Sequence, residues 1–108
     1  MSEIPLEEFK KIELLVAKIL DVQEIPGADR LWKLNVDVGA EKKEIVAGVK
    51  AFYTKEALMG RSIIVVNNLG PAVIRGVESR GMLLAAKDGV NLSLIAPDKE
   101  LPAGSVVG

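Results

Sequence analysis

The side chains that could do chemistry in this sequence are cations and amides, whereas the usual nucleophiles and bases are missing. The 108 residues include no Cys and no His, so the thiol nucleophile, the commonest general base and the commonest transition-metal ligands are excluded. The acidic residues are scattered through predicted turns, and no glycine-rich phosphate loop ending in Gly-Lys-Ser or Gly-Lys-Thr occurs. We therefore predict a binding protein, not an enzyme, without cofactor or metal.

Lys33 and Asn35 are predicted to project from one face of a strand. Apolar and polar residues alternate from Trp32 to Val38, a pattern typical of an antiparallel strand with one buried face. On the polar face the lysine offers a mobile positive charge, and the amide can read base or 2′-hydroxyl edges of RNA. An ordinary solvated strand face explains the same residues, so this pattern alone leaves both interpretations open.

The charge distribution favours a polyanionic ligand only weakly. The net charge is −1, from 14 basic and 15 acidic residues, yet residues 30–87 hold ten bases against five acids. Charge runs of this kind most often only solvate a face. Lys42 and Lys43 are placed in the loop between the second and third predicted strands, where they could attract phosphate. Further cations for the rim of a site are Lys50, Lys55 and Arg61.

The elements that must position these residues have the order of a small barrel. Pro5 with glutamates after it predicts a short N-terminal helix within residues 1–11, and Thr54 as N-cap with Gly60 as stop predicts a second. Five strand-like stretches are residues 12–22, 32–38, 45–49, 62–68 and 82–86. Three strands, a helix and two strands follow the order of the OB-fold, a five-stranded Greek-key barrel. We therefore predict a single, mainly all-β domain, with the barrel over residues 12–87.

Two stretches of this predicted barrel are irregular. In the first strand Ile12, Leu14 and Val16 set an alternation that slips around residues 17–19, which predicts a bulge. Residues 69–81 are predicted to form a long irregular connection between the fourth and fifth strands, one of the loops with which OB-folds grip ligands. This connection and the residue after it contain Arg75, Ser79, Arg80 and Met82.

Residues 88–108 hold more apolar side chains than a finished small barrel can accommodate. We therefore predict that this C-terminal extension covers another surface, that of a second copy in a homodimer. The predicted interface residues are Leu92, Leu94, Ile95, Leu101, Val106 and Val107.

Several ordered segments resemble one known family over about residues 9–108. They are Pro26–Gly39, Ile45–Val49, Tyr53–Gly60 and, most specific, Asn68–Pro71 followed by Arg75–Ala86. In these segments the chain is similar to the tRNA-binding domain of methionyl-tRNA synthetases, found at their C-terminus or as a separate beta subunit. The same domain occurs in free-standing tRNA-binding proteins and in endothelial-monocyte-activating-polypeptide-II-like proteins.

The resemblance implies a non-catalytic OB-fold that recognises the structured shape of tRNA and supports the catalytic subunit of a methionyl-tRNA synthetase. Members with an extension of this length form homodimers. Ser79 is implied as a partner of phosphate or sugar and Met82 as a contact to a base, with a turn cap and a core residue as the respective alternatives. The expected RNA-binding residues are Lys33, Asn35, Lys42, Lys43, Arg75, Ser79, Arg80 and Met82.

The first strand departs from the family's pattern. The family often reads Asp-Leu-Arg-Val-Gly-Lys-Ile, but here Leu15 and Ala17 replace the arginine and the glycine. One potential phosphate contact is lost, so we expect no RNA contact from this strand beyond Lys18.

Two other functions fit the same pattern. A homodimeric peptide-binding chaperone of similar fold would show an exposed apolar groove in place of a basic face, and a purely structural module would only hold a synthetase dimer together. The basic middle segment favours RNA. The longest apolar run, Met82 to Ala86, is far shorter than the ~20 residues of a membrane helix, and no export signal is visible. We therefore expect a cytoplasmic protein without a membrane partner.

Overall fold

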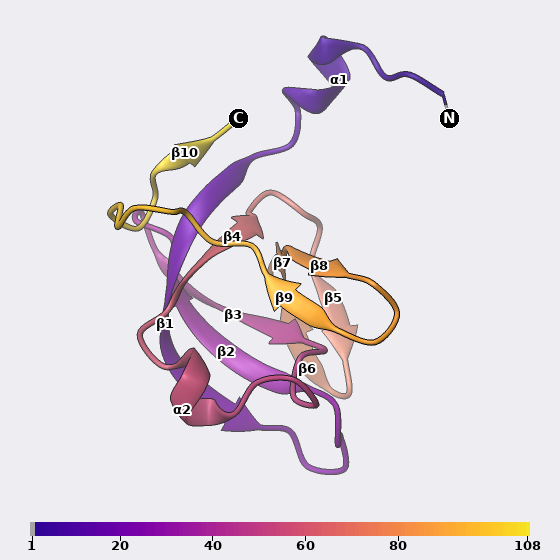
Figure 1. The fold of residues 1–108 in the computed structure, drawn as a ribbon, viewed down its shortest axis with the longest axis vertical. Helices are drawn as coiled ribbons and strands as arrows, with labels where there is room; N and C mark the ends of the chain where they lie inside the picture. Colours follow the sequence, from indigo (N-terminus) through magenta and orange to yellow (C-terminus); the bar gives the residue numbers. More distant parts are fainter. Residues whose placement is uncertain (1) are drawn as a thin grey trace.

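One long strand organises the molecule, which the computed structural model describes over residues 2–108. Strand β1 (Leu14–Glu24) pairs antiparallel with β2 (Trp32–Asp37) along its second half and with β4 (Ser62–Val66) along its first half. The sheet has the order β3-β2-β1-β4-β7, with β3 at Lys42–Ala47 and β7 at Met82–Leu83. The sheet curls into a half-barrel around the core (Figure 1). The predicted all-β architecture is confirmed.

The remaining elements are two short helices, two separate pairs of strands and one strand that extends the curled sheet. Two short helices are α1 (Leu6–Phe9) and α2 (Lys55–Leu58). The other strands are β5 (Ala72–Ile74), β6 (Val77–Ser79), β8 (Ala85–Lys87), β9 (Leu92–Leu94) and β10 (Val106–Val107). Strands β5 and β6 pair with each other, as do β8 and β9, while β10 pairs with the start of β1.

The bend in β1 lets one strand serve both halves of the sheet. The register with β2 shifts between Ile19 and Asp21, so the irregular residue is Leu20, slightly later than predicted. Leu15, Ala17 and Ile19 enter the main core cluster. The predicted phase of this strand was therefore wrong. Val16, on the opposite side, is also only 2% exposed, and alternation cannot identify the core face of a strand that is buried on both sides.

Strand β2 and helix α2 match their predicted patterns. Buried and half-buried residues alternate along β2, and Trp32, Leu34 and Val36 lie in the main core cluster. The hydroxyl oxygen of Thr54 accepts a hydrogen bond from the backbone N–H of Ala57 at 3.2 Å, so the threonine is the predicted N-cap. Leu58 is fully buried, which anchors this single turn of helix to the core.

The two connections predicted as loops contain strand residues. Lys42 and Lys43 begin strand β3, and the turn before it is closed by a hydrogen bond from the Val38 N–H to the Glu41 carbonyl. Within residues 69–81, strands β5 and β6 form a hairpin whose turn consists of Arg75 and Gly76.

The predicted fifth strand divides at Leu84. Strand β7 pairs with β4, whereas β8 turns away to pair with β9. Leu84 links the two pairings: its N–H donates to the carbonyl of Ile64 in β4, and its carbonyl accepts from the N–H of Ile95, which follows β9. Leu94, which follows in β9, is 8% exposed and belongs to the main core cluster.

The tail runs back along the free edge of β1. Gly104 N–H donates to the carbonyl of Val16 at 2.7 Å, and Val16 N–H donates to Ser105 at 2.9 Å. Gly104 and Gly39 meet backbone to backbone, because a Cβ on Gly39 would lie 2.8 Å from the Gly104 Cα. The turn between β2 and β3 can therefore approach the tail this closely only because both contact positions are glycines. No helix within residues 2–108 is long and apolar enough to cross a membrane.

Candidate nucleic-acid interface

Lys33, Asn35 and Lys42 share the outer face of strands β2 and β3. Lys33 and Asn35 are half-buried between inward-facing residues, which confirms that they project from one side of the strand. Lys42 is exposed opposite Asp37 in the register of the two strands. The fold thus brings two cations and one amide onto a single face. The strand pattern predicts this position for Lys33 and Asn35, whereas Lys42 was predicted in a loop and lies instead at the start of β3.

Acidic side chains neutralise much of this face. The Lys33 ammonium lies 3.2 Å from a carboxylate oxygen of Glu44, the residue paired with Asn35 across the strands. The Arg80 guanidinium lies 3.2 Å from Glu41. An approaching phosphate would therefore compete with carboxylates for both cations, and the excess of bases in residues 30–87 does not appear as an open basic face.

Lys43 lies inside the barrel end and not at the rim. Its side chain follows the core side of β3, it is 7% exposed, and its ammonium donates to the carbonyl of Asn67 at 2.9 Å. Burial lowers the pKa of Lys43, and Arg80 acts in the same direction while Glu41 and Glu13 oppose it. The predicted loop position for this lysine was wrong, because strand β3 begins one residue before it.

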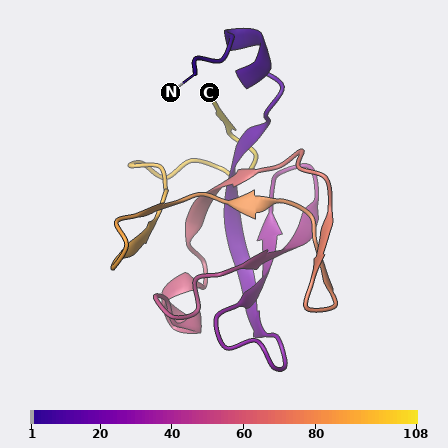
Figure 2. The ribbon, with the colours of Figure 1, turned by 90° about the vertical axis from the view of Figure 1, so that its right-hand side faces the viewer.

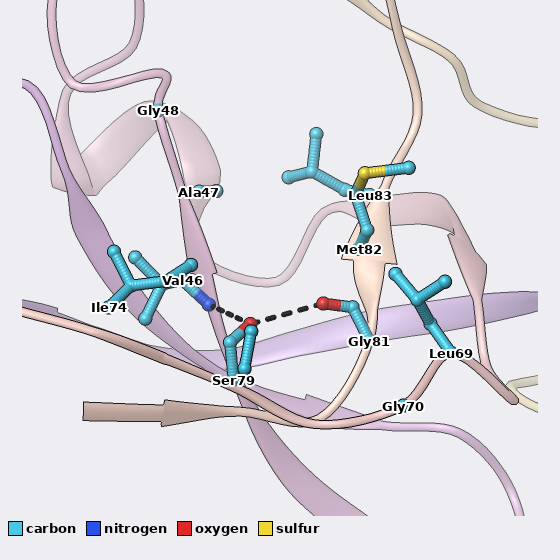
Figure 3. A pocket seen from close by; sticks show the side chains of 11 residues that line it. Val46, Ala47, Gly48, Leu69, Gly70, Ile74, Ser79, Gly81, Met82 and Leu83 are labelled. Atoms are coloured by element: carbon cyan, nitrogen blue, oxygen red, sulfur yellow. Dashed lines mark hydrogen bonds between the residues drawn. The ribbon is translucent and has the colours of Figure 1, made fainter.

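Ser79 holds the β5–β6 hairpin against β3. The residue is 4% exposed, and its hydroxyl accepts from the Val46 N–H at 2.9 Å and donates to the Gly81 carbonyl at 3.1 Å (Figure 3). The hydroxyl therefore both accepts and donates a hydrogen bond within the protein, as the turn-cap interpretation expects. The Arg80 N–H continues the attachment by donating to the Glu44 carbonyl.

Beside Ser79 an apolar groove of about 390 Å³ opens between β3, the β5–β6 hairpin and β7. Met82 and Leu69, each 47% exposed, line it together with the half-buried Leu83 and Ile74 (Figure 3). Sequence analysis identified Met82 but missed Leu69 and Ile74. The sequence could have indicated Leu69, because an apolar residue directly before Gly70-Pro71 lies outside a strand and is therefore expected to remain exposed.

Arg75 lies apart from the strand face. It occupies the tip of the β5–β6 hairpin, where it lines a second hollow with Arg30 and the backbone of Gly27 and Ala28. Trp32 is 8% exposed with its indole N–H donating to the Tyr53 carbonyl, so its ring offers no stacking surface for a base. Within residues 2–108, no group of three His, Cys, Asp or Glu side chains could hold a metal ion.

The predicted interface residues of the tail divide into two groups. Leu94 is buried in the protein's own core and Leu92 packs against it, so these two serve the monomer. Val106, Leu101 and Ile95 remain exposed, at 84%, 46% and 40% respectively. Val107, in β10 like Val106, is half-buried beside β1.

Comparisons with known proteins agree with this geometry. The family model described as "Putative tRNA binding domain" matches residues 14–106. A methionine–tRNA ligase of Methanococcus aeolicus is 50% identical over 107 residues, which cover 99% of this chain and 16% of that protein. A methionine–tRNA ligase of Thermococcus onnurineus is 47% identical over 102 residues, covering 94% of this chain and 14% of that protein. The chain thus spans about one-seventh of the length of these relatives.

Solved structures share the entire fold. A protein described as methionyl-tRNA-synthetase-related from Pyrococcus horikoshii superposes with a TM-score of 0.94 at 35% identity, with complete coverage of both chains. The chaperone CsaA of Bacillus anthracis superposes with a TM-score of 0.89 at 25% identity, covering 99% of this chain and 100% of that one. The fold is therefore common to proteins with two different described functions.

Proposed function

This chain belongs to the tRNA-binding domain family, and from that membership we propose that it binds tRNA as an accessory module without catalysis of its own. The observation that carries the proposal is the family match over residues 14–106. The relatives are whole methionine–tRNA ligases of which this domain is a small part. We propose that the module raises the tRNA affinity of a methionyl-tRNA synthetase, as a domain or a subunit of it, in the cytoplasm.

The contact surface proposed is the outer face of β2 and β3 with the edge of the adjoining groove. Lys33 and Lys42 attract phosphate, Asn35 offers both a donor and an acceptor, and Met82 lies exposed at the adjoining groove. Lys43 and Ser79 support this surface from within, because their polar atoms bond to the protein backbone. A face with few unpaired charges suits recognition of tRNA by shape more than by charge density.

A salt series tests the proposal. Binding of unmodified tRNA transcripts is measured for the wild-type protein, for Lys33→Ala plus Lys42→Ala, and for the control Lys87→Ala plus Lys99→Ala, which removes two exposed cations elsewhere. We expect affinity to fall with salt, with a log-log slope of roughly −0.7 to −0.9 for each phosphate contacted. The strand variant should weaken binding at least tenfold more than the control. Absence of wild-type binding at low salt would refute the proposal.

The apolar groove favours a second candidate function, the binding of an extended apolar peptide. Its open volume of about 390 Å³ and the exposed Met82 are suited to an apolar side chain, and the solved neighbour from Bacillus anthracis is described as a chaperone. Met82→Asp discriminates the two functions. It should abolish binding of an apolar peptide, whereas it should weaken tRNA binding only moderately because the phosphate contacts remain.

We further propose that two copies associate through the end that carries both termini. None of the residues of α1 is buried, Leu6 in that helix is 64% exposed, and the exposed Val106 lies in β10 beside the start of β1. Association would place two tRNA-binding surfaces on one particle and raise the effective concentration of the second.

A further inference from the structure

A hollow of about 350 Å³ lies between two loops at the end of the molecule opposite the termini. One loop is residues 25–31, which joins β1 to β2, and the other is the tip of the β5–β6 hairpin. Figures 1 and 2 show both loops reaching the same end of the barrel. The hollow is lined by Gly27, Ala28, Asp29, Arg30, Leu31 and Arg75.

A separate apolar cluster fixes these two loops relative to each other. Ile25 and Ala28 from the first loop are buried against Val46 of β3. Ile74 and Val77, which flank the hairpin turn, pack against the same cluster. The backbone positions of Arg30 and Arg75 are therefore set by packing, not left to independent loops.

The hairpin turn places an arginine where other residues fit better. Arg75 has a φ of +53° and is followed by Gly76 at +79°. Two-residue hairpin turns with both φ values positive favour Asn-Gly or Gly-Gly, because a Cβ crowds the backbone in the left-handed region. An arginine there carries a conformational cost that its side chain does not offset by any ion pair with residues 2–108.

The two arginines differ from Lys33, Lys50 and Arg80 in lacking acidic partners. Within residues 2–108, neither Arg30 nor Arg75 has a carboxylate oxygen within 4.0 Å, whereas Lys33, Arg80 and Lys50 each have one. Both arginines are exposed. Asp29 is the acid that lines the hollow with them.

We infer that this hollow is a binding site for a phosphate of the nucleic-acid backbone, with Arg30 and Arg75 as its two cationic arms. A guanidinium donates paired hydrogen bonds to phosphate oxygens, and two of them from fixed loops hold one phosphodiester from two sides. The site rests on the proposed tRNA-binding function and adds to it Arg30, which the strand-face pattern does not include. It anchors the RNA beyond the end of the face that carries Lys33.

Variants that remove the two arms test the site against a matched loss of charge. tRNA binding is measured over a salt series for wild type, Arg30→Ala plus Arg75→Ala, and the control Lys87→Ala plus Lys99→Ala. We expect the arginine variant to bind about tenfold to a hundredfold more weakly and its salt slope to be shallower by roughly 0.7 to 1.8. Asp29→Asn should tighten binding several-fold, because it removes the competing carboxylate. Circular dichroism confirms that each variant is folded.

A second measurement does not depend on tRNA. Inorganic pyrophosphate is titrated into ¹⁵N-labelled wild-type protein, and we expect shifts concentrated at the amides of Gly27, Ala28 and Gly76 that the double arginine variant lacks. If wild type binds tRNA but the arginine variant matches the lysine control, the site is refuted and the proposed function stands. If wild type binds no tRNA, the proposed function fails, and the pyrophosphate shifts alone decide whether the hollow binds phosphate.

Discussion

Glu44 controls how strongly Lys33 can act on a phosphate. Its carboxylate lies 3.2 Å from the lysine ammonium, and both side chains are partly exposed, so the pair contributes at most about 1 kcal/mol to stability. Glu44→Gln removes the competitor while keeping the shape of the side chain. We expect tRNA affinity to rise about two- to fivefold, with little change in unfolding free energy.

The matched control for this variant is Glu56→Gln, an equal change of charge at an exposed position of α2. Binding of both variants is compared by fluorescence anisotropy at low and moderate salt. An equal rise for both would mean that net charge alone is responsible. A fall for Glu44→Gln would show that the carboxylate orients Lys33 instead of competing for it.

Lys43 makes the free energy of unfolding depend on pH in the alkaline range. Because burial lowers its pKa from 10.5, the unfolded chain holds this proton more tightly than the folded chain. At neutral pH both states are protonated and the cost of burying the charge is fully present. As pH rises through the folded-state pKa, the folded protein loses the proton first, so the free energy of unfolding increases.

Lys43→Met isolates this dependence. The methionine fills similar space without a charge, so the wild type should gain stability relative to the variant over the alkaline range as the pH rises toward the unfolded-state pKa of 10.5. Urea denaturation midpoints of both proteins at several pH values in that range provide the measurement. A constant difference between them would contradict the assignment of the cost to Lys43.

At the scale of residues, sequence identified the cations but not their partners. Lys33 and Asn35 were placed on one face because alternation along β2 is unambiguous, whereas Lys42 was predicted in a loop and instead begins β3. The pairing of Lys33 with Glu44 depends on the register between strands, which a single sequence does not specify. The burial of Lys43 and Ser79 depends on where β3 begins and where the hairpin docks, and polar residue types give no signal of either.

At the scale of elements, local patterns predicted those elements whose stability is local. The N-cap of α2 and the alternation of β2 could be recognised because a single segment contains the cause. The β5–β6 hairpin was missed because its turn, Arg75-Gly76, lacks the usual Asn-Gly signal, and because its apolar contacts are to Val46 and to residues 25–28. Contacts between distant segments leave no periodicity in either one.

The contact between the tail and the turn joining β2 to β3 predicts a sharp effect of one methyl group. In Gly104→Ala the new Cβ would lie 3.0 Å from both the Gly39 Cα and the Val38 carbonyl oxygen, at a φ of +91°. Strain and crowding together should lower the unfolding free energy by about 2–4 kcal/mol. The tail should also detach from β1, since the Gly104 N–H bonds to Val16.

Gly89→Ala separates the two causes. Gly89 has a φ of +94° but nothing within 4 Å of an added Cβ, so its replacement should cost only the backbone strain, about 1 kcal/mol. Chemical denaturation gives the stabilities, and hydrogen exchange at the Val16 amide reports detachment of the tail. Equal effects of the two substitutions would show that the close approach of Gly39 and Gly104 is relaxed easily.

At the scale of the whole molecule, one end exposes apolar side chains that no other part of residues 2–108 covers. Both termini lie at this end (Figure 1), where α1 projects without a buried residue and Ile4, Leu6 and Val106 are 67%, 64% and 84% exposed. A helix this short is not stable in isolation, and α1 gains no stability from packing because its apolar residues are exposed. The proposed association of two copies about a twofold axis would supply the missing partner.

The charges along the N-terminal segment fit such a twofold contact. Acidic Glu3, Glu7 and Glu8 precede basic Lys10 and Lys11, so an antiparallel association of two copies would place the acids of one beside the lysines of the other. A heterologous partner would require no such self-complementary order.

Leu6→Glu plus Val106→Asp should therefore convert a dimer to a monomer, as measured by sedimentation equilibrium. Val90→Asp, equally exposed at 80% but in the turn between β8 and β9, should leave the dimer intact. The monomeric variant should retain the salt slope of tRNA binding for one module, because Lys33 and Arg75 lie away from this end, but lose affinity through the lost second contact. A wild-type monomer at high micromolar concentration would rule out self-association, and α1 would then need a different protein to cover its apolar side.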